Sequence, residues 1–126
     1  MENIEYVRPQ DIVKRSFAII SKELEEKGIV LPKEQELVTK RAIHTSADFD
    51  YAKTMTYSAH AVGIAKKLIQ NGADIVTDTN MALAGVNKKE LAKYGGKAHC
   101  FMAEEEVAKI AKERGVTRAA VSMEKA

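Results

Sequence analysis

The sequence predicts an α/β fold with a parallel sheet, because predicted strands alternate with predicted helices in its second half. Two short apolar runs bounded by turn signals, DIVTD at 74–78 and KAHCFM at 97–102, are each followed by a helical pattern. Strands that alternate with helices are typical of parallel sheets, because the helix returns the chain to the same end of the sheet. With 126 residues and no repeat or flexible linker, residues 1–126 are expected to form one domain.

The first half of the chain predicts three helices. The first begins at Pro9, since proline suits the first helical turn, and ends at Gly28. The second opens at Pro32 and fades near residue 46. The third runs from Ser58, a good N-cap, to Gly72. Its inward-facing residues are expected to be Ala61, Ala65, Leu68 and Ile69.

The second half predicts two strands with helices between and after them. Asn87 is expected to cap a short helix, and the last helix is expected to start at Thr117. The predicted elements are a strand over 74–78, helices over 79–85 and 87–94, a strand over 97–102, a helix over 103–115 that Gly115 ends, and a final helix from 117.

Composition excludes several classes of protein. The 20 Lys and Arg residues nearly balance the 18 Asp and Glu residues and are scattered, so no nucleic-acid footprint is expected. No apolar stretch approaches the ~20 residues that span a bilayer, and MENIEYVRPQD does not resemble a secretory signal, so we expect a cytoplasmic protein without a membrane segment. The one cysteine, Cys100, is expected to be a buried thiol.

His44 stands at the end of the second predicted helix, on a stripe beside its apolar face. A histidine that changes charge near neutral pH suits general acid–base chemistry, and from this stripe it can reach a cleft. A surface or helix-capping histidine would show the same spacing, so the pattern leaves both interpretations open.

The first predicted helix carries a polar interruption, Arg15-Ser16, inside the run IVKRSFAII. Ser16 falls between Ile12 and Ile20 on the inward face, where a hydroxyl needs a partner. One interpretation is a pair that faces a ligand. The other is a serine bonded to the backbone one turn earlier, with the arginine extending to solvent.

Three further candidates lie in the second half. Thr77 and Asp78 follow the apolar residues DIV of the first predicted strand, at the end of the sheet where ligands of open α/β sheets usually bind, although a helix-capping turn would look similar. Arg118 follows the predicted N-cap of the last helix and suits a carboxylate ligand, or is simply solvated. His60 and His99 are assigned structural roles, and no metal site, glycine-rich phosphate loop or nucleophile elbow is predicted.

Four motifs, in this order, give the chain its resemblance to a known family: YVRPQDIVKRSFAII, RAIHTSADFD, YSAHAVGIAKKLIQNGADIVTDTNMALAGV and TRAAVSME. Together they resemble the N-terminal part of the precorrin-8X and cobalt-precorrin-8 methylmutases, over nearly the whole chain. The resemblance implies a homodimeric α/β enzyme of cobalamin biosynthesis with a three-layer-like sandwich of helices on a sheet. It also implies migration of a methyl group from C-11 to C-12 of a corrinoid substrate, with or without cobalt, and no external cofactor.

The same resemblance implies roles for the candidate residues. His44 stands where the family places the histidine that donates a proton to the macrocycle. The substrate-binding residues that it implies are Arg15, Ser16, Thr77, Asp78 and Arg118. The arginines would meet the acetate and propionate groups of the substrate.

The chain departs from the family at its C-terminus. Members of the family continue into further strands and a Gly-Asn-Ala-Pro segment that this sequence lacks. The expectation is therefore a domain without the family's C-terminal strands. The alternative to an active enzyme is a corrinoid-binding or structural fragment without turnover.

Overall fold

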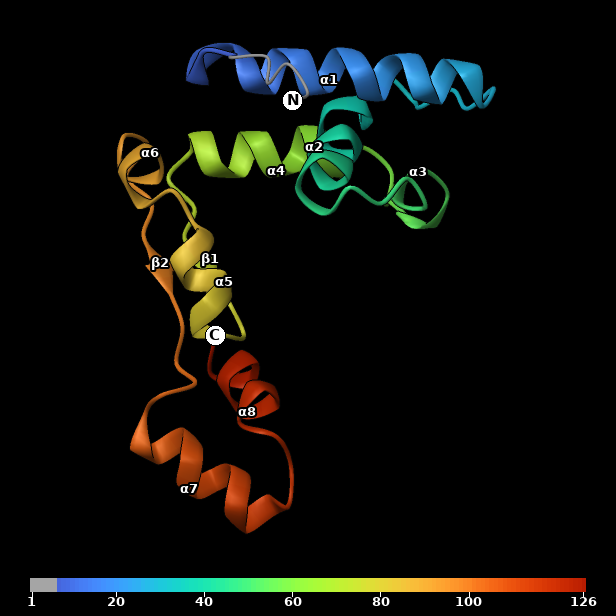
Figure 1. Cartoon of the computed structure of the whole chain (residues 1–126). Coiled ribbons are helices and arrows are strands. Elements are labelled where there is room, and N and C mark those ends of the chain that lie inside the picture. The colour runs from blue at the N-terminus through green and yellow to red at the C-terminus, as the bar shows by residue number, and fades with distance from the viewer. Residues whose placement is uncertain (1–6) are drawn as a thin grey trace, which may run out of the picture. The chain divides into compact units, whose positions relative to one another are not determined.

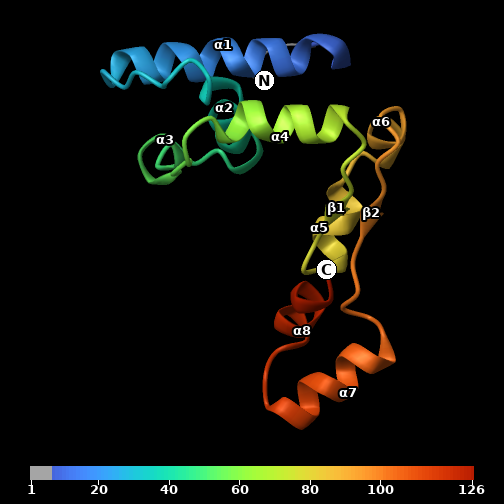
Figure 2. The ribbon, with the colours of Figure 1, turned by 180° about the vertical axis from the view of Figure 1, so that it is seen from behind.

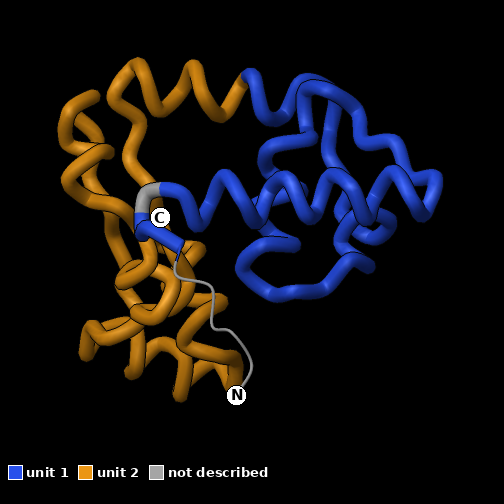
Figure 3. The backbone as a smooth tube through the Cα atoms, turned by 45° about the horizontal axis from the view of Figure 1, so that its top comes forward, with its two compact units in different colours: residues 1–63 blue, residues 64–126 orange. Residues whose placement is uncertain are grey.

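A computed structural model describes residues 7–126 of the chain (Figure 1). The described residues fall into two compact units, residues 1–63 and residues 64–126 (Figure 3). Each unit is described by itself below. The expectation of a single domain over residues 1–126 stays a prediction.

Unit 1 is helical, and its first helix follows the prediction closely. Helix α1 (Pro9–Glu26) has Pro9 in its first turn, and Gly28 takes the left-handed conformation just after its end, with φ +65°. Arg8 pairs with Asp11 across the first turn at 3.0 Å. Helix α2 (Glu36–Ser46) lies against α1 and ends at Ala47, which is also left-handed. Local sequence signals therefore set both ends of α1.

Three boundaries in unit 1 differ from the sequence-based expectation. Helix α2 begins at Glu36 because residues 32–35 form a turn first, in which the N–H of Gln35 donates to the carbonyl of Pro32 at 2.9 Å. A short helix, α3 (Tyr51–Thr54), lies between the second and third predicted helices, where no element is predicted. Helix α4 (Ala61–Gln70) starts after His60, whose φ of +58° ends any helical path back to Ser58. Ser58 is therefore not the N-cap.

The core of unit 1 forms where α1 meets α2. Ile20, Leu24 and Ile43 are buried there. Four partly buried side chains pack against them: Ile29, Leu31, Phe49 and Ala52. This apolar contact holds the second half of α1 to the last turns of α2, one residue away from His44.

Unit 2 contains a two-stranded parallel sheet. Strand β1 (Ile75–Val76) pairs with β2 (Ala98–His99), with Ile75 opposite Ala98 and Val76 opposite His99 (Figure 2). The predicted parallel pairing of the two strands is thus confirmed. The α/β description holds only in a coarse form, because the structure is mostly helical and each strand has two residues.

Four helices lie entirely within unit 2, and three of them have a side-chain N-cap. They are α5 (Asn80–Gly85), α6 (Lys88–Ala92), α7 (Glu105–Arg114) and α8 (Arg118–Lys125). The side chains of Thr79, Asn87 and Thr117 each accept a backbone N–H of the helix they precede, which confirms the predicted caps at Asn87 and Thr117. Gly115 ends α7 with a φ of +66°, as predicted.

The core of unit 2 lies between α7 and α8. It consists of Val107, Ala111 and Val121, with Phe101 and Ile110 packed against it. Gly96, just before β2, is required by space, since a Cβ atom there would lie 2.5 Å from the carbonyl oxygen of Ala73. Three residues differ from expectation: Ala65 and Leu68 on α4 are exposed rather than inward-facing, Leu68 by 54%, and Cys100 is half-buried. Neither buried cluster among the described residues reaches α4.

Candidate functional site

His44 lies in a cleft of unit 1. Its ring sits in the last turn of α2, and the cleft of about 310 Å³ runs between this turn, α1 and the loop that follows α2. The walls are largely apolar, with Ile12, Ile19 and Phe49 among the lining residues. Of the two interpretations of His44, the structure supports the one in which the ring reaches a cleft, because the imidazole is half-buried there rather than on an open surface.

Ser16 holds one nitrogen of the His44 ring. The Oγ atom of Ser16 lies 2.7 Å from Nδ1 of His44, across the α1–α2 contact. Phe17 packs edge-on against the imidazole, with ring centroids 5.9 Å apart and planes at 65°, and the guanidinium of Arg41 lies 5.1 Å from the Phe17 ring centroid. The Ser16 hydroxyl therefore contacts the His44 ring beside the cleft. Within residues 7–126 it makes no hydrogen bond to the preceding turn of backbone, which was the alternative interpretation.

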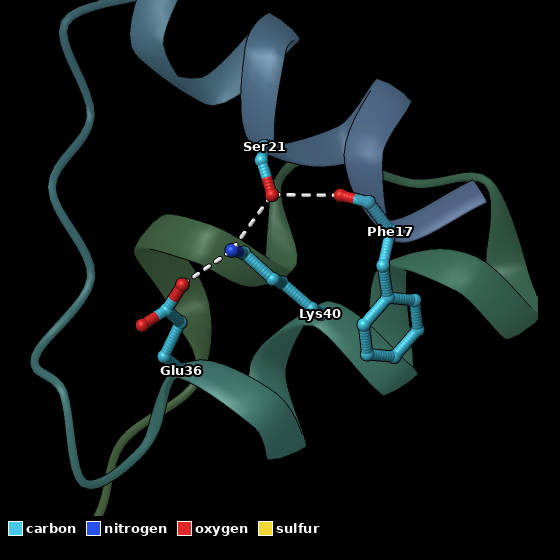
Figure 4. A network of polar contacts seen from close by, with 4 residues as sticks. All are labelled: Phe17, Ser21, Glu36 and Lys40. Atoms are coloured by element: carbon cyan, nitrogen blue, oxygen red, sulfur yellow. Dashed lines mark hydrogen bonds and ion pairs between the residues drawn. The ribbon is translucent and has the colours of Figure 1, made fainter. Parts of the chain in front are cut away.

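A second polar contact joins the same two helices one turn away. The Nζ atom of Lys40 donates to Ser21 Oγ at 2.8 Å and pairs with Glu36, while Ser21 donates to the carbonyl of Phe17 at 2.7 Å (Figure 4). The Lys40 side chain is 12% exposed. This contact, which sequence reasoning missed, is a second polar link between α1 and α2 and does not touch His44.

A signal for this contact was available in the sequence. Glu36, Lys40 and His44 follow one another at steps of four, which places them on one stripe of a helix. Ser16 and Ser21 interrupt the apolar pattern of the facing helix. The spacing predicts a shared face, although it does not say which helix this face meets.

Arg15 also lines the His44 cleft, beside Ser16 on α1. Its side chain is exposed and engages in interactions of its own. Arg15, Ser16 and His44 are thus brought together within unit 1. An arginine at the mouth of an apolar cleft can bind a carboxylate through two parallel hydrogen bonds.

Thr77 and Asp78 follow β1 in unit 2, as predicted. The N–H of Thr77 donates to the carbonyl of His99 at 2.9 Å, and its hydroxyl lies 3.0 Å from the carbonyl of Thr79 and 3.3 Å from that of His99. Asp78 is exposed, and Thr79 caps α5. The helix-capping interpretation of this turn is therefore correct for Thr79, while Asp78 remains accessible to a ligand.

Arg118 lies elsewhere in unit 2, at the first position of α8. Its side chain is exposed and lines a shallow hollow with Lys109 and Lys112 of α7. This hollow contains neither Thr77 nor Asp78. Within unit 2 the candidate residues are therefore at two separate places.

The strongest electrostatic effect near the sheet falls on Asp74, just before β1. The backbone N–H of Lys97 donates to Oδ1 at 2.7 Å and the His99 ring bonds Oδ2 at 2.8 Å; these contacts, the first one most, hold the pKa of Asp74 below its usual value. His99 also stacks on Phe101, with ring centroids 6.0 Å apart. His99 thus links β2 to the residue before β1, in agreement with a structural role.

Residues 7–126 offer neither a cluster of metal-ligating side chains nor a membrane-spanning helix. No three His, Cys, Asp or Glu side chains in this part of the chain gather closely enough to hold a metal ion. No helix in the same range has both the length and the apolar character needed to cross a membrane.

Comparison with known proteins identifies the family. The model of the precorrin-8X methylmutase family matches residues 11–126. A cobalt-precorrin-8 methylmutase of Priestia megaterium is 35% identical over 95% of this chain and 52% of its own length, and one of Salmonella typhimurium is 36% identical over 93% and 57%.

A solved structure agrees with the sequence comparison. The precorrin-8x methyl mutase from Thermus thermophilus superposes with a TM-score of 0.76 and 30% identity over 92% of this chain and 54% of its own. The chain therefore spans about half the length of the relatives that it matches. Over that half, sequence and fold agree: the chain belongs to the precorrin-8X methylmutase family.

Proposed function

We propose that this chain acts in cobalamin biosynthesis as a methylmutase, with His44 as the proton donor. The reaction moves a methyl group from C-11 to C-12 of precorrin-8X or cobalt-precorrin-8 and gives hydrogenobyrinate or cobyrinate. Membership of the family supports the reaction class. The observation that carries the residue assignment is the His44 ring, which lies in an apolar cleft with one nitrogen bonded to Ser16.

The chemistry requires little from the protein beyond shape and one acid. The methyl group leaves one carbon of the macrocycle and joins the next, so the atoms balance within the substrate and no co-reactant is consumed. A proton or strong hydrogen bond from His44 to the macrocycle withdraws electron density where the bond migrates. A positioned acid of this kind is typically worth ~10²–10⁴-fold in rate.

The size of the cleft limits how the substrate would bind. A tetrapyrrole with its carboxylate arms is larger than about 310 Å³, so the cleft would hold one edge of the ring and leave the rest outside. Ile12, Ile19 and Phe49 would contact the apolar edge, and Arg15 would meet a carboxylate arm.

The family resemblance also implies substrate-binding residues in unit 2, and they are kept as part of the proposal. Thr77 and Asp78 offer polar groups after β1, and Arg118 offers a cation for a second carboxylate. A single domain, the three-layer arrangement, a homodimer and a cytoplasmic location are kept as predictions. Because the chain spans about half of its relatives, a corrinoid-binding or structural protein without turnover is the second candidate.

Turnover of the purified chain tests the proposal. The chain is incubated with precorrin-8X, and separately with its cobalt form, while the visible spectrum and the product mass are followed. Isomerisation leaves the mass unchanged, so we expect a spectral change at constant mass that His44→Ala abolishes. His60→Ala is the matched control, because His60 lies away from the cleft, pairs only loosely with Glu34 at 3.7 Å and is expected to leave the rate unchanged.

The outcomes separate the two candidates. Binding of the tetrapyrrole without any spectral conversion would favour the non-catalytic protein. Conversion that survives His44→Ala would remove His44 from the mechanism. Conversion lost equally in His60→Ala would mean that the variants act through folding, which circular dichroism of each variant checks.

A further inference from the structure

The bond between Ser16 and His44 raises a question about the imidazole that the proposed function leaves open. A neutral imidazole carries its proton on one nitrogen only, and the partner of the other nitrogen decides which. Nδ1 of His44 lies 2.7 Å from Ser16 Oγ, and Nε2 has no hydrogen-bond partner among residues 7–126. The two nitrogens therefore have different surroundings.

The Ser16 hydroxyl has one polar contact in the described part of the chain, the Nδ1 atom. Serine in a helix often donates to the carbonyl four residues earlier, as Ser21 does to Phe17 at 2.7 Å. Ser16 has no such bond within residues 7–126, so its hydrogen is available for Nδ1. A hydroxyl that donates to Nδ1 leaves the proton of the neutral ring on Nε2.

We infer that Ser16 is a positioning residue for His44, which fixes the neutral ring in the tautomer with its proton on Nε2 and keeps that N–H directed away from Ser16. The inference deepens the proposed function and rests on it for its catalytic consequence. It assigns Ser16 to the histidine, whereas the family resemblance implies a contact between Ser16 and the substrate.

A hydroxyl is well suited to this task because it both donates and accepts. When His44 is protonated, Nδ1–H donates to Ser16 Oγ; when the ring is neutral with its proton on Nε2, Ser16 donates to Nδ1. The same short bond thus holds the ring in both states. Phe17 packs edge-on against the ring and restricts its rotation further.

Two contrasting serines on α1 allow a controlled test. Ser16→Ala removes the bond to His44, and Ser21→Ala removes a hydroxyl of the same helix that contacts Lys40 instead. Alanine favours helix, so both variants are expected to fold. The 126-residue chain is labelled with 15N, and long-range 1H–15N spectra of the His44 ring are recorded in alkaline buffer, where imidazole is neutral.

The spectra decide the inference without any assay of activity. We expect the unaltered chain to show a single tautomer with Nδ1 unprotonated, Ser16→Ala to show an exchange-averaged mixture, and Ser21→Ala to match the unaltered chain. A proton on Nδ1 in the unaltered chain would overturn the inference. Ring shifts that are identical in Ser16→Ala would overturn it as well.

Kinetics add a readout that separates positioning from substrate binding. If Ser16 positions the acid, Ser16→Ala lowers kcat about tenfold with KM nearly unchanged. If Ser16 instead binds substrate, KM rises while kcat holds, and the inference fails. A chain without turnover would refute the proposed function alone, because the tautomer measurement stands by itself.

Discussion

Within each of the two units, neighbouring helices are held together by different kinds of contact. In unit 1, α1 and α2 are linked by half-buried polar contacts, Ser16 to His44 and Lys40 to Ser21, set beside an apolar core. In unit 2, α7 and α8 share an apolar core, and their ion pairs lie at the exposed edge, where Arg114 pairs with Glu124 and Lys125 with Glu104.

This difference bears on how firmly each unit can orient a polar side chain. A half-buried hydrogen bond orients a side chain more strongly than an exposed one, because water competes less for its donor and acceptor. An exposed ion pair is screened and orients little. The contacts of unit 1 therefore suit it to hold the His44 ring in place, whereas the exposed charges of unit 2 contribute little to orientation.

The largest expected effect is a difference in coupling energy between one polar contact of unit 1 and one ion pair of unit 2. A double-mutant cycle of Lys40→Met and Ser21→Ala should give a coupling energy of about 1.5 kcal/mol, because the bond involves a charged group that is largely buried. The cycle of Arg114→Gln and Glu124→Gln, with side chains 48% and 55% exposed, should give a smaller coupling that weakens further in salt.

Hydrogen exchange measures each coupling in its own unit. Amides of α1 and α2 report the first cycle, and amides of α7 and α8 report the second. Equal coupling energies in the two cycles, or a salt dependence of the first cycle alone, would contradict the stronger coupling expected in unit 1.

A smaller effect of opposite sign is expected at Ser122 in unit 2. Its side chain is fully buried on α8, and within residues 7–126 its hydroxyl has no hydrogen-bond partner. Removal of an unsatisfied buried hydroxyl should stabilise the protein, so Ser122→Ala is expected to raise the free energy of unfolding by about 1 kcal/mol. Thermal denaturation checks this, and Ser16→Ala, which removes a satisfied hydroxyl, is the contrasting variant.

The smallest expected effect is a pH dependence of unit 2. The pKa of Asp74 is lowered in the folded protein, chiefly by the N–H of Lys97 and then by His99. The folded state therefore binds fewer protons than the unfolded state at this group. The stabilisation is complete above the ordinary carboxyl pKa of 3.8 and is lost as the pH falls through the lowered value.

Exchange of the amides beside β1 and β2, followed as the pH is lowered, measures this loss. Asp74→Asn keeps an oxygen for the Lys97 N–H but removes the carboxylate, so its stability should vary less over the same range. A variant and an unaltered chain with the same pH profile would show that Asp74 does not contribute.

Local signals in the sequence predicted much of the secondary structure. Pro9 and Gly28 bound the first helix, and Asn87, Gly115 and Thr117 mark helix ends, because caps act within a few residues of chain. The start of α4 was placed wrongly at Ser58, since the left-handed backbone of His60 has no local signal in that sequence. The predicted strands are also longer than the two-residue strands of the structure, because strand pairing depends on residues that are distant in the sequence.

The candidate site divides in the same manner. The positions of His44 at the end of a helix beside an apolar stripe, and of Ser16 as an interruption of another stripe, follow from a helical period of 3.6 residues. Their contact at 2.7 Å, and the contact of Lys40 with Ser21 one turn away, depend on how the helices pack. Residues 28 positions apart in the chain are brought together by the packing of Ile20, Leu24 and Ile43, and no local pattern specifies which helix faces are buried against each other.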